Sequence, residues 1–207
     1  MRKPPAETDT RERLLRAGGQ IFAERGFRAA TVREIVARAG ANLAAVNYHF
    51  RDKEGLYAAV LEHSARIALE KHPPYGGLRP EAPAEEQLGA FVRAFLQRLF
   101  DPAAVHGRLM AREMVEPTAA LDRIVEQVIR PLYGRLCAIV KALAGRSLPP
   151  GRTELAAKSL VGQILFYKLC TPVLQRLDGR PPDARDLDRI AEHITAFSLR
   201  GLGGRRR

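Results

Sequence analysis

Hydrogen-bonding and small side chains gather in the segment 31–50, which has the sequence TVREIVARAGANLAAVNYHF. Thr31 stands three residues before Glu34, the spacing of a capping box in which each side chain binds the backbone N–H of the other residue. The pattern predicts a short helix that stops before Gly40 and a second short helix over about 43–49. Two short helices joined by a tight turn containing glycine form a helix-turn-helix, whose second helix can enter the major groove of DNA.

The second helix of this motif has small or hydrogen-bonding residues on the face that would point outward, as contact with base edges requires. Apolar residues such as Ile35 and Val46 would hold the two helices at a fixed angle. The free N–H groups behind Thr31 suit a phosphate, and Lys53 can neutralise another. We therefore predict a DNA-binding surface that consists of Thr31, Arg33, Asn42, Leu43, Ala44, Ala45, Asn47, Tyr48, His49 and Lys53.

Several of these residues also have a simpler interpretation. Tyr48 could close the core of the motif, although the three successive residues from Tyr48 to Phe50 cannot all face inward. His49 could contact DNA or only cap its helix, and Thr31 is in any case partly an N-cap. Arg33 could contact the DNA backbone or be a solvated surface residue.

The elements that position the motif are all predicted to be helices, because apolar residues recur at helical spacing and no strand alternation is found. The clearest interruption is 72–83, where prolines and glycines cannot continue a helix. We expect an all-α protein with a three-helix DNA-binding domain and a larger helical domain for ligand binding and dimerisation. About nine helices are expected, over roughly 9–26, 31–39, 43–49, 53–71, 88–99, 102–115, 118–144, 154–177 and 183–199.

Two domains follow from this division. Residues 8–71 would form the DNA-binding domain with its connecting helix, and residues 84–201 the second domain. Pro131 predicts a kink and Pro172 a bend or break in the long helices that contain them. Over 160–174 apolar residues surround the helix, which predicts burial against the protein's own core on one side and against a second subunit on the other.

Composition narrows the class of protein. The 207 residues have a formal charge of +11, which is typical of a polyanion binder, but most of it lies beyond residue 60 and an arginine-rich genomic bias explains it equally well. We expect neither a membrane span nor a signal peptide, and a cytoplasmic location, because no apolar run is long enough. Cys137 and Cys170 lack metal-ligand spacing and are expected to be buried thiols, with a redox switch as the alternative.

An α-helical enzyme would need a converging catalytic set. The five histidines, at positions 49, 63, 72, 106 and 193, have no ligand spacing, and no glycine-rich phosphate loop or nucleophile motif is found. We therefore expect no metal, cofactor or catalysis. A helical interaction adaptor that kept the fold and lost DNA binding is the other alternative, which the intact Thr31, Tyr48 and Lys53 disfavour.

The run 10–61 resembles the DNA-binding domain of the TetR/AcrR family of bacterial regulators. The residues that carry this resemblance are Phe22, Gly26, Phe27, Thr31, Ile35, Ala39, Gly40, Tyr48, His49, Phe50, Lys53 and Leu56. The departures from the family pattern are Val36, Ala41, Asn42 and Asn47. Asn42 can still cap the second helix, so the departures indicate a different operator preference. The run 42–50, with Leu121 and Pro131 downstream, is similar to the CecR-like subgroup.

The resemblance implies a homodimeric transcriptional regulator, a repressor released from a palindromic operator by a small-molecule effector. The two recognition helices would lie about 34–36 Å apart to read successive major grooves. Dimerisation would use the helices over 154–177 and 183–199, and the helix over 53–71 would couple ligand to DNA because it belongs to both domains. The middle helices would line the ligand pocket, although each candidate could be plain core and a solvated face explains Glu113 equally well. The candidates are Phe91, Phe95, Leu109, Met110, Glu113, Met114, Tyr133, Cys137, Gln163 and Phe166.

Overall fold

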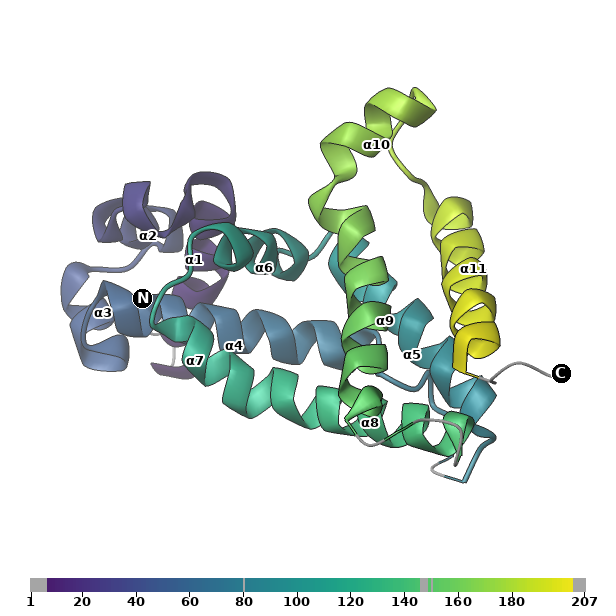
Figure 1. Ribbon diagram of the computed structural model, residues 1–207. Helices are drawn as coiled ribbons and strands as arrows, with labels where there is room; N and C mark the ends of the chain where they lie inside the picture. The colour runs from purple at the N-terminus through teal and green to yellow at the C-terminus, as the bar shows by residue number, and fades with distance from the viewer. Residues whose placement is uncertain (1–6, 80, 146–148, 150, 203–207) are drawn as a thin grey trace, which may run out of the picture. The chain divides into compact units, whose positions relative to one another are not determined.

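All regular secondary structure in the described part of the chain is helical, as expected (Figure 1). The computed structural model describes residues 7–79, 81–145, 149 and 151–202. These ranges contain the α-helical segments α1–α11 and one π-helical turn, η1, where the sequence predicts about nine helices. The difference arises because two of the expected helices are each divided near a proline.

The chain forms two compact units that do not follow its order along the sequence. The first comprises residues 1–68 and 102–127, and the second comprises residues 69–101 and 128–207. Residues 102–127 therefore pack with the N-terminal segment. The expected division into domains 8–71 and 84–201 stays a prediction about folding domains.

The first unit holds the predicted helix-turn-helix. The bounds of the two motif helices agree with the sequence prediction to within one residue. The helices of this unit are α1 (Glu7–Ala29), α2 (Val32–Ala39), α3 (Leu43–Phe50), α4 (Lys53–Lys71, whose last residues belong to the second unit), α6 (His106–Val115) and α7 (Ala120–Ile124).

Aromatic side chains fill the centre of the first unit. The Phe22 ring meets the Tyr57 ring edge-on at a centroid distance of 4.8 Å, and the Phe27 ring lies 5.0 Å from the Tyr57 ring. Phe22 and Tyr57 are at most 2% exposed. Helix α6 packs against α1, its Leu109 is fully buried, and residues 102–127 belong to the first unit.

The helical dihedrals of α1 are interrupted at Gly26 (φ 79°, ψ 170°), where the sequence predicts the stop. A positive φ favours glycine because it lacks a Cβ. The Arg112 guanidinium donates hydrogen bonds to the carbonyls of Ala23 (3.1 Å) and Glu24 (2.7 Å), shortly before this interruption. Arg112 therefore fixes the point at which the chain leaves α1 for α2.

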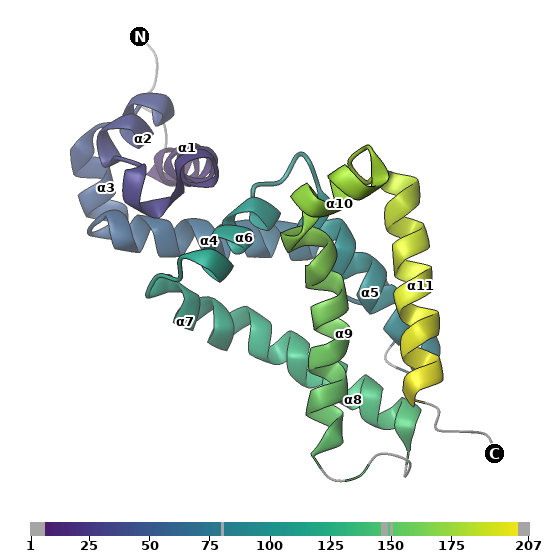
Figure 2. The ribbon, with the colours of Figure 1, turned by 45° about the horizontal axis from the view of Figure 1, so that its top comes forward.

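The second unit packs aliphatic side chains from several helices together. Leu88, Leu136 and Ile164, from three different helices, are fully buried in one core cluster. Figures 1 and 2 both show α11 running alongside α5. The helices of this unit are α5 (Ala84–Phe100), α8 (Arg130–Ala144), α9 (Arg152–Leu169), α10 (Thr171–Asp178) and α11 (Ala184–Leu202).

Two prolines explain the divided helices. The expected helix over 118–144 consists of α7, the π-helical turn η1 (Val125–Ile129) and α8, with Pro131 at the start of α8. Proline has no N–H and its ring collides with the carbonyl four residues earlier, so a wider turn ahead of it relieves both problems. The expected helix over 154–177 ends at Leu169, and α10 restarts with Pro172 in its first turn.

Candidate nucleic-acid interface

Helix α2 begins with the predicted capping box. Thr31 has extended dihedrals (φ −115°, ψ 146°), its Oγ1 accepts a hydrogen bond from the Glu34 backbone N–H (3.3 Å), and the Thr31 N–H donates to Glu34 Oε2 (3.0 Å). The Thr31 hydroxyl also donates a hydrogen bond to Glu34 Oε2 (2.9 Å). This bond and then the one from the Thr31 backbone N–H lower the pKa of Glu34, and the nearby Arg25 adds to the effect. The Thr31 hydroxyl is thus occupied within the protein, and the phosphate contact predicted for it stays a prediction.

The turn between α2 and α3 is closed by glycine and by an arginine from α1. Gly40 adopts the left-handed conformation (φ 58°, ψ 40°) that ends many helices. Arg13 Nη1 donates to the carbonyls of Ala39 (2.8 Å) and Gly40 (3.1 Å). No local sequence signal reveals this role of Arg13, because it depends on where α1 lies in the fold.

Helix α3 shows the division of faces that the sequence predicts. Val46 and Phe50 are 1% and 6% exposed, whereas Leu43 is 51% and Tyr48 72% exposed. The Asn42 side-chain oxygen accepts a hydrogen bond from the Ala45 N–H at 2.9 Å and so caps the helix. The other predicted contact residues follow the same division: Asn42, Ala44 and Asn47 are exposed, and Ala45 and His49 are half-buried.

Lys53 ties the start of α4 to the end of α1. Its Nζ donates to the Arg28 carbonyl at 3.3 Å and lies 4.6 Å from the centroid of the Phe27 ring. The Lys53 ammonium group therefore stabilises the fold, and it could also bind a phosphate that approaches it.

Among the described residues of this surface, some arginines form an ion pair with a carboxylate and others do not. Arg25 forms an ion pair with Glu34, and Arg38 with Glu24. Three other exposed arginines form no ion pair with any carboxylate that the structure describes: Arg28, Arg33 and Arg51. Arg51 is absent from the sequence prediction. It has φ 73° at the end of α3, a conformation that spacing alone does not reveal.

The residues predicted to line a ligand pocket fall in both compact units. In the first unit, Glu113 is buried and accepts hydrogen bonds from the Tyr57 hydroxyl (2.7 Å) and from the Thr118 backbone N–H (3.1 Å). Leu109 is buried, Met110 is half-buried and Met114 is 42% exposed. In the second unit, Phe91, Phe95, Tyr133 and Cys137 belong to or pack against the core, Gln163 is half-buried and Phe166 is 51% exposed. A ligand-binding role for any of them stays a prediction.

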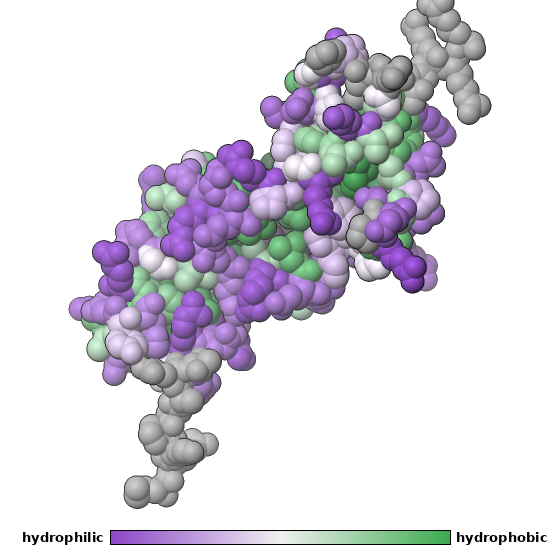
Figure 3. Space-filling model, turned by 90° about the horizontal axis from the view of Figure 1, so that it is seen from below, coloured by the Kyte–Doolittle hydropathy of each residue, from purple (hydrophilic) through white to green (hydrophobic). Residues whose placement is uncertain are grey.

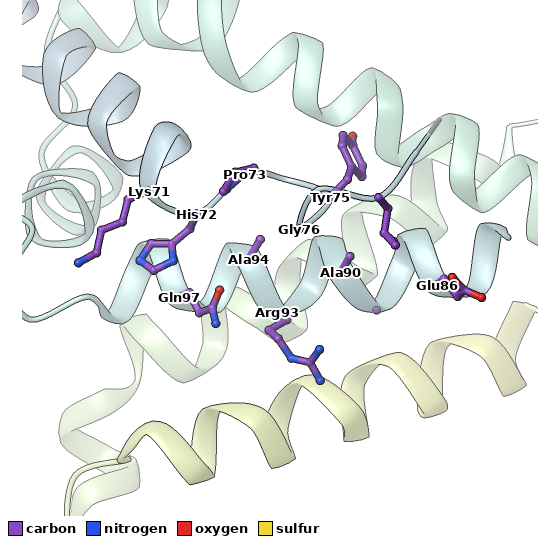
Figure 4. A pocket seen from close by; sticks show the side chains of 12 residues that line it. Lys71, His72, Pro73, Tyr75, Gly76, Glu86, Ala90, Arg93, Ala94 and Gln97 are labelled. Carbon is purple, nitrogen blue, oxygen red and sulfur yellow. The ribbon is translucent and has the colours of Figure 1, made fainter. Parts of the chain in front are cut away.

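A groove of about 590 Å³ lies in the second unit between α5 and the segment that precedes it (Figure 4). Its walls include His72, Tyr75, Ala90, Arg93 and Gln97. None of the residues predicted from the sequence lines this groove. The sequence prediction omitted it because one wall comes from 72–78, part of a segment expected only to interrupt the helices, and the other from the face of α5 that carries Ala90 and Arg93.

No helix in the described residues combines the length and apolar character that crossing a bilayer demands. Within the same residues, no group of three or more histidine, cysteine or acidic side chains is placed to hold a metal ion.

A capped, outward-facing helix of small and hydrogen-bonding residues, held by a glycine turn against a second short helix, defines a helix-turn-helix DNA-binding protein. Comparison with known families gives the same result. Residues 14–60 match the model described as bacterial regulatory proteins of the tetR family. Residues 84–202 match the C-terminal domain of the HTH-type transcriptional dual regulator CecR.

Whole-chain relatives extend this likeness. The chain is 32% identical over 209 aligned positions to the dual regulator CecR of Shigella flexneri, covering 94% of this chain and 93% of that protein. It is 30% identical to the transcriptional regulator BetI of Yersinia pestis, covering 74% and 76% of the two chains. A tetR-family regulatory protein from Rhodococcus RHA1 has a similar crystal structure (TM-score 0.71, 22% identity, 94% and 97% covered).

The chain therefore belongs to the TetR family of bacterial transcriptional regulators, and its C-terminal part is of the CecR type. The predicted family, the all-α fold and the function as a DNA-binding transcriptional regulator are thereby confirmed. Members of this family bind operator DNA and form dimers, and they regulate transcription rather than catalyse reactions.

Proposed function

We propose that this chain acts in the cytoplasm as a homodimeric repressor that binds a palindromic operator through α3 and leaves it when a small-molecule effector binds. The observation that carries the proposal is the exposed face of α3. Leu43 and Tyr48 are largely exposed while Val46 and Phe50 anchor the helix from the opposite side. A helix held in this way can insert into a groove about 12 Å wide without rearranging.

Each contact residue has a stated role in this proposal. Tyr48 and Lys53 bind phosphates and set the position of the protein on the duplex. Asn47 and Ala45 lie on α3 where base edges are read. Because bound phosphates release counterions, operator affinity falls steeply as salt concentration rises.

The test begins with selection of bound genomic fragments by the purified protein, followed by fluorescence anisotropy on the selected operator. Tyr48→Ala should weaken binding to all sequences, whereas Asn47→Ala should alter the preferred base at one position, worth about 1–3 kcal/mol of discrimination. Lys141→Gln on α8 is the control, since Lys141 is exposed in the second unit and lies outside the helices proposed for dimerisation. Unchanged affinity of Tyr48→Ala would refute the role of α3, and failure to bind any DNA would favour the interaction adaptor.

Dimerisation is proposed through the helices over 154–177 and 183–199. Large apolar side chains lie exposed along α9, α10 and α11, each between 43% and 75% exposed, and burying them in a second copy is favourable. Figure 3 shows one face of the molecule, on which hydrophobic residues lie exposed among hydrophilic ones. The exposed apolar residues of these helices are Leu155, Phe166, Leu169, Val173, Leu177 and Phe197.

Sedimentation velocity tests this interface. Val173→Glu should raise the fraction of monomer, because a carboxylate would be buried without a partner. Val115→Glu is the matched control, because Val115 is 76% exposed and belongs to α6 of the first unit rather than to the helices proposed for dimerisation. If Val173→Glu remains as fully dimeric as the control, the dimer forms elsewhere.

Release of the operator by an effector requires a structural element whose arrangement depends on both the DNA-binding site and the effector site. Helix α4 begins in the first unit, beside the DNA-contacting residues, and its last residues belong to the second. An effector that binds one arrangement of a dimer better than another changes the separation of the two α3 helices and lowers operator affinity by its differential affinity for the two states. The anisotropy assay measures this directly when a candidate effector is titrated into the complex.

A further inference from the structure

Arg98 on α5 is a buried cation without an acidic partner. The residue is 4% exposed, its Nη1 donates to the His72 carbonyl at 2.8 Å, and its guanidinium lies 5.5 Å from the centroid of the Phe95 ring. No carboxylate in the described part of the chain forms an ion pair with it. A guanidinium has five N–H donors, and buried charges in proteins are normally paired. Burial lowers the pKa of Arg98 to about 10, so it remains charged at neutral pH.

A buried hydroxyl faces the same region. Tyr75 Oη is buried without a hydrogen-bond partner, and the Arg135 guanidinium lies 5.3 Å from the centroid of the Tyr75 ring. Burial raises the pKa of Tyr75, and the positive charges of Arg135 and Arg98 oppose that rise. Two guanidinium groups therefore act on one buried hydroxyl, and no carboxylate among the described residues forms an ion pair with either of them.

The surroundings of this cluster suit an apolar molecule with one charged group. The Phe91 ring contacts the Tyr75 ring (6.3 Å) and the Phe95 ring (5.9 Å, edge-on). Tyr75 and Ala94 line the groove of about 590 Å³, a volume typical of small-molecule sites, and Arg98 follows Ala94 by one helical turn. In Figure 4 the Tyr75 ring lies on the other side of its segment from the Arg93 and Gln97 side chains.

We propose that Arg98, Tyr75 and Arg135 bind the carboxylate of a small organic acid whose apolar part packs in the groove and against Phe91. A carboxylate accepts several charge-assisted hydrogen bonds at once, which neither an amide nor an alcohol can reproduce. The proposal names the chemical class of the effector and so rests on the effector-dependent part of the proposed function.

The test measures binding in the absence of DNA. Benzoate and hexanoate are each compared with their neutral counterparts, benzamide and hexanamide, by thermal unfolding and by isothermal titration calorimetry. At about 20 mM, an acid that binds with millimolar affinity should raise the unfolding temperature by about 2–4 °C, and its amide should not. Sodium chloride and sodium phosphate at equal ionic strength show whether any small anion has the same effect.

Two variants separate a binding role from a structural one. Arg98→Gln should raise the dissociation constant of the acid about tenfold or more, through loss of a charge-assisted hydrogen bond. Tyr75→Phe removes only a hydroxyl that has no partner, so the variant should be at least as stable as the parent without ligand, yet bind the acid several-fold more weakly. Lys141→Gln on α8, an exposed residue outside the cluster, should change neither quantity.

The proposal is overturned if each amide stabilises the protein as much as its acid, if chloride or phosphate matches the acids, or if Tyr75→Phe leaves acid affinity unchanged. The Tyr75 variant keeps the test decisive even if Arg98→Gln fails to fold. Because no DNA is present, these outcomes leave operator binding through α3 untouched.

Discussion

Gly55, in the first turn of α4, should tolerate no side chain. A Cβ built on Gly55 would lie 2.0 Å from the Phe50 carbonyl oxygen and 3.2 Å from the Phe50 carbonyl carbon. These are backbone atoms at the end of α3, so they cannot swing aside as a flexible side chain does. The Gly55 N–H also donates to Asp52 Oδ1 at 2.7 Å, which caps α4. Gly55→Ala must therefore open the turn that joins α3 to α4.

The magnitude follows from three contributions. Overpacking costs about 1–3 kcal/mol, and a weakened cap about 1 kcal/mol more. The higher helix propensity of alanine relative to glycine stabilises the folded state by about 1 kcal/mol. The free energy of unfolding should therefore fall by about 1–3 kcal/mol. Gly134→Ala on α8 should show the opposite sign, a gain of about 0.5–1 kcal/mol, because nothing lies within 4 Å of a Cβ there.

Urea unfolding followed by circular dichroism measures both variants, and fluorescence anisotropy measures their affinity for the selected operator. Because the α3–α4 turn sets the direction of the recognition helix, Gly55→Ala should lose operator affinity even under conditions where it remains folded. Gly134→Ala should retain it. If Gly55→Ala proves as stable as the parent and binds the operator equally well, the inferred geometry of the turn is wrong.

Three other changes test the first unit. Tyr57→Phe leaves the buried Glu113 carboxylate without one of its donors and should lower the free energy of unfolding by about 1.5–3 kcal/mol in urea titrations. Asn42→Ala removes the cap of α3 and should cost about 1 kcal/mol, most of which Asn42→Ser should restore, as judged by the same titrations. Burial lowers the pKa of His63, so as pH falls the unfolded chain binds the proton before the folded chain does. The free energy of unfolding should therefore be highest above about pH 7 and decrease as pH drops through about 6.5, the ordinary pKa of histidine. His63→Gln should reduce this pH dependence, as measured by thermal unfolding over a pH series.

The motif itself was predictable because its signals are local. The Thr31–Glu34 capping box and Gly40 act on backbone groups within four residues, so spacing alone set the bounds of α2. The packing of residues 102–127 with the N-terminal segment was not predictable, because it depends on contacts such as that between Arg112 and the Ala23 carbonyl, 89 residues apart. Proline positions revealed that two helices are interrupted, but not that one interruption takes the form of a π-helical turn.

The candidate functional residues were also predictable from the sequence only in part. Which side of α3 faces outward followed from helical periodicity, since Val46 and Phe50 are four residues apart and both are buried. The cluster around Arg98 and Tyr75 could not be found from spacing. An arginine in an amphipathic helix has the same sequence pattern whether its guanidinium reaches solvent or is buried, and only the fold decides between these outcomes.

Thr31 and Lys53 show why loss of DNA binding alone cannot assign a contact. Thr31 closes the capping box of α2, and Lys53 binds the Arg28 carbonyl, so replacing either residue also disturbs the scaffold. The salt dependence of binding separates the two effects. A lost phosphate contact lowers the slope of log affinity against log salt concentration by about one, whereas a disturbed scaffold lowers affinity at every salt concentration and leaves the slope unchanged. A residue of this surface therefore contacts DNA only if its substitution changes the slope or the base preference.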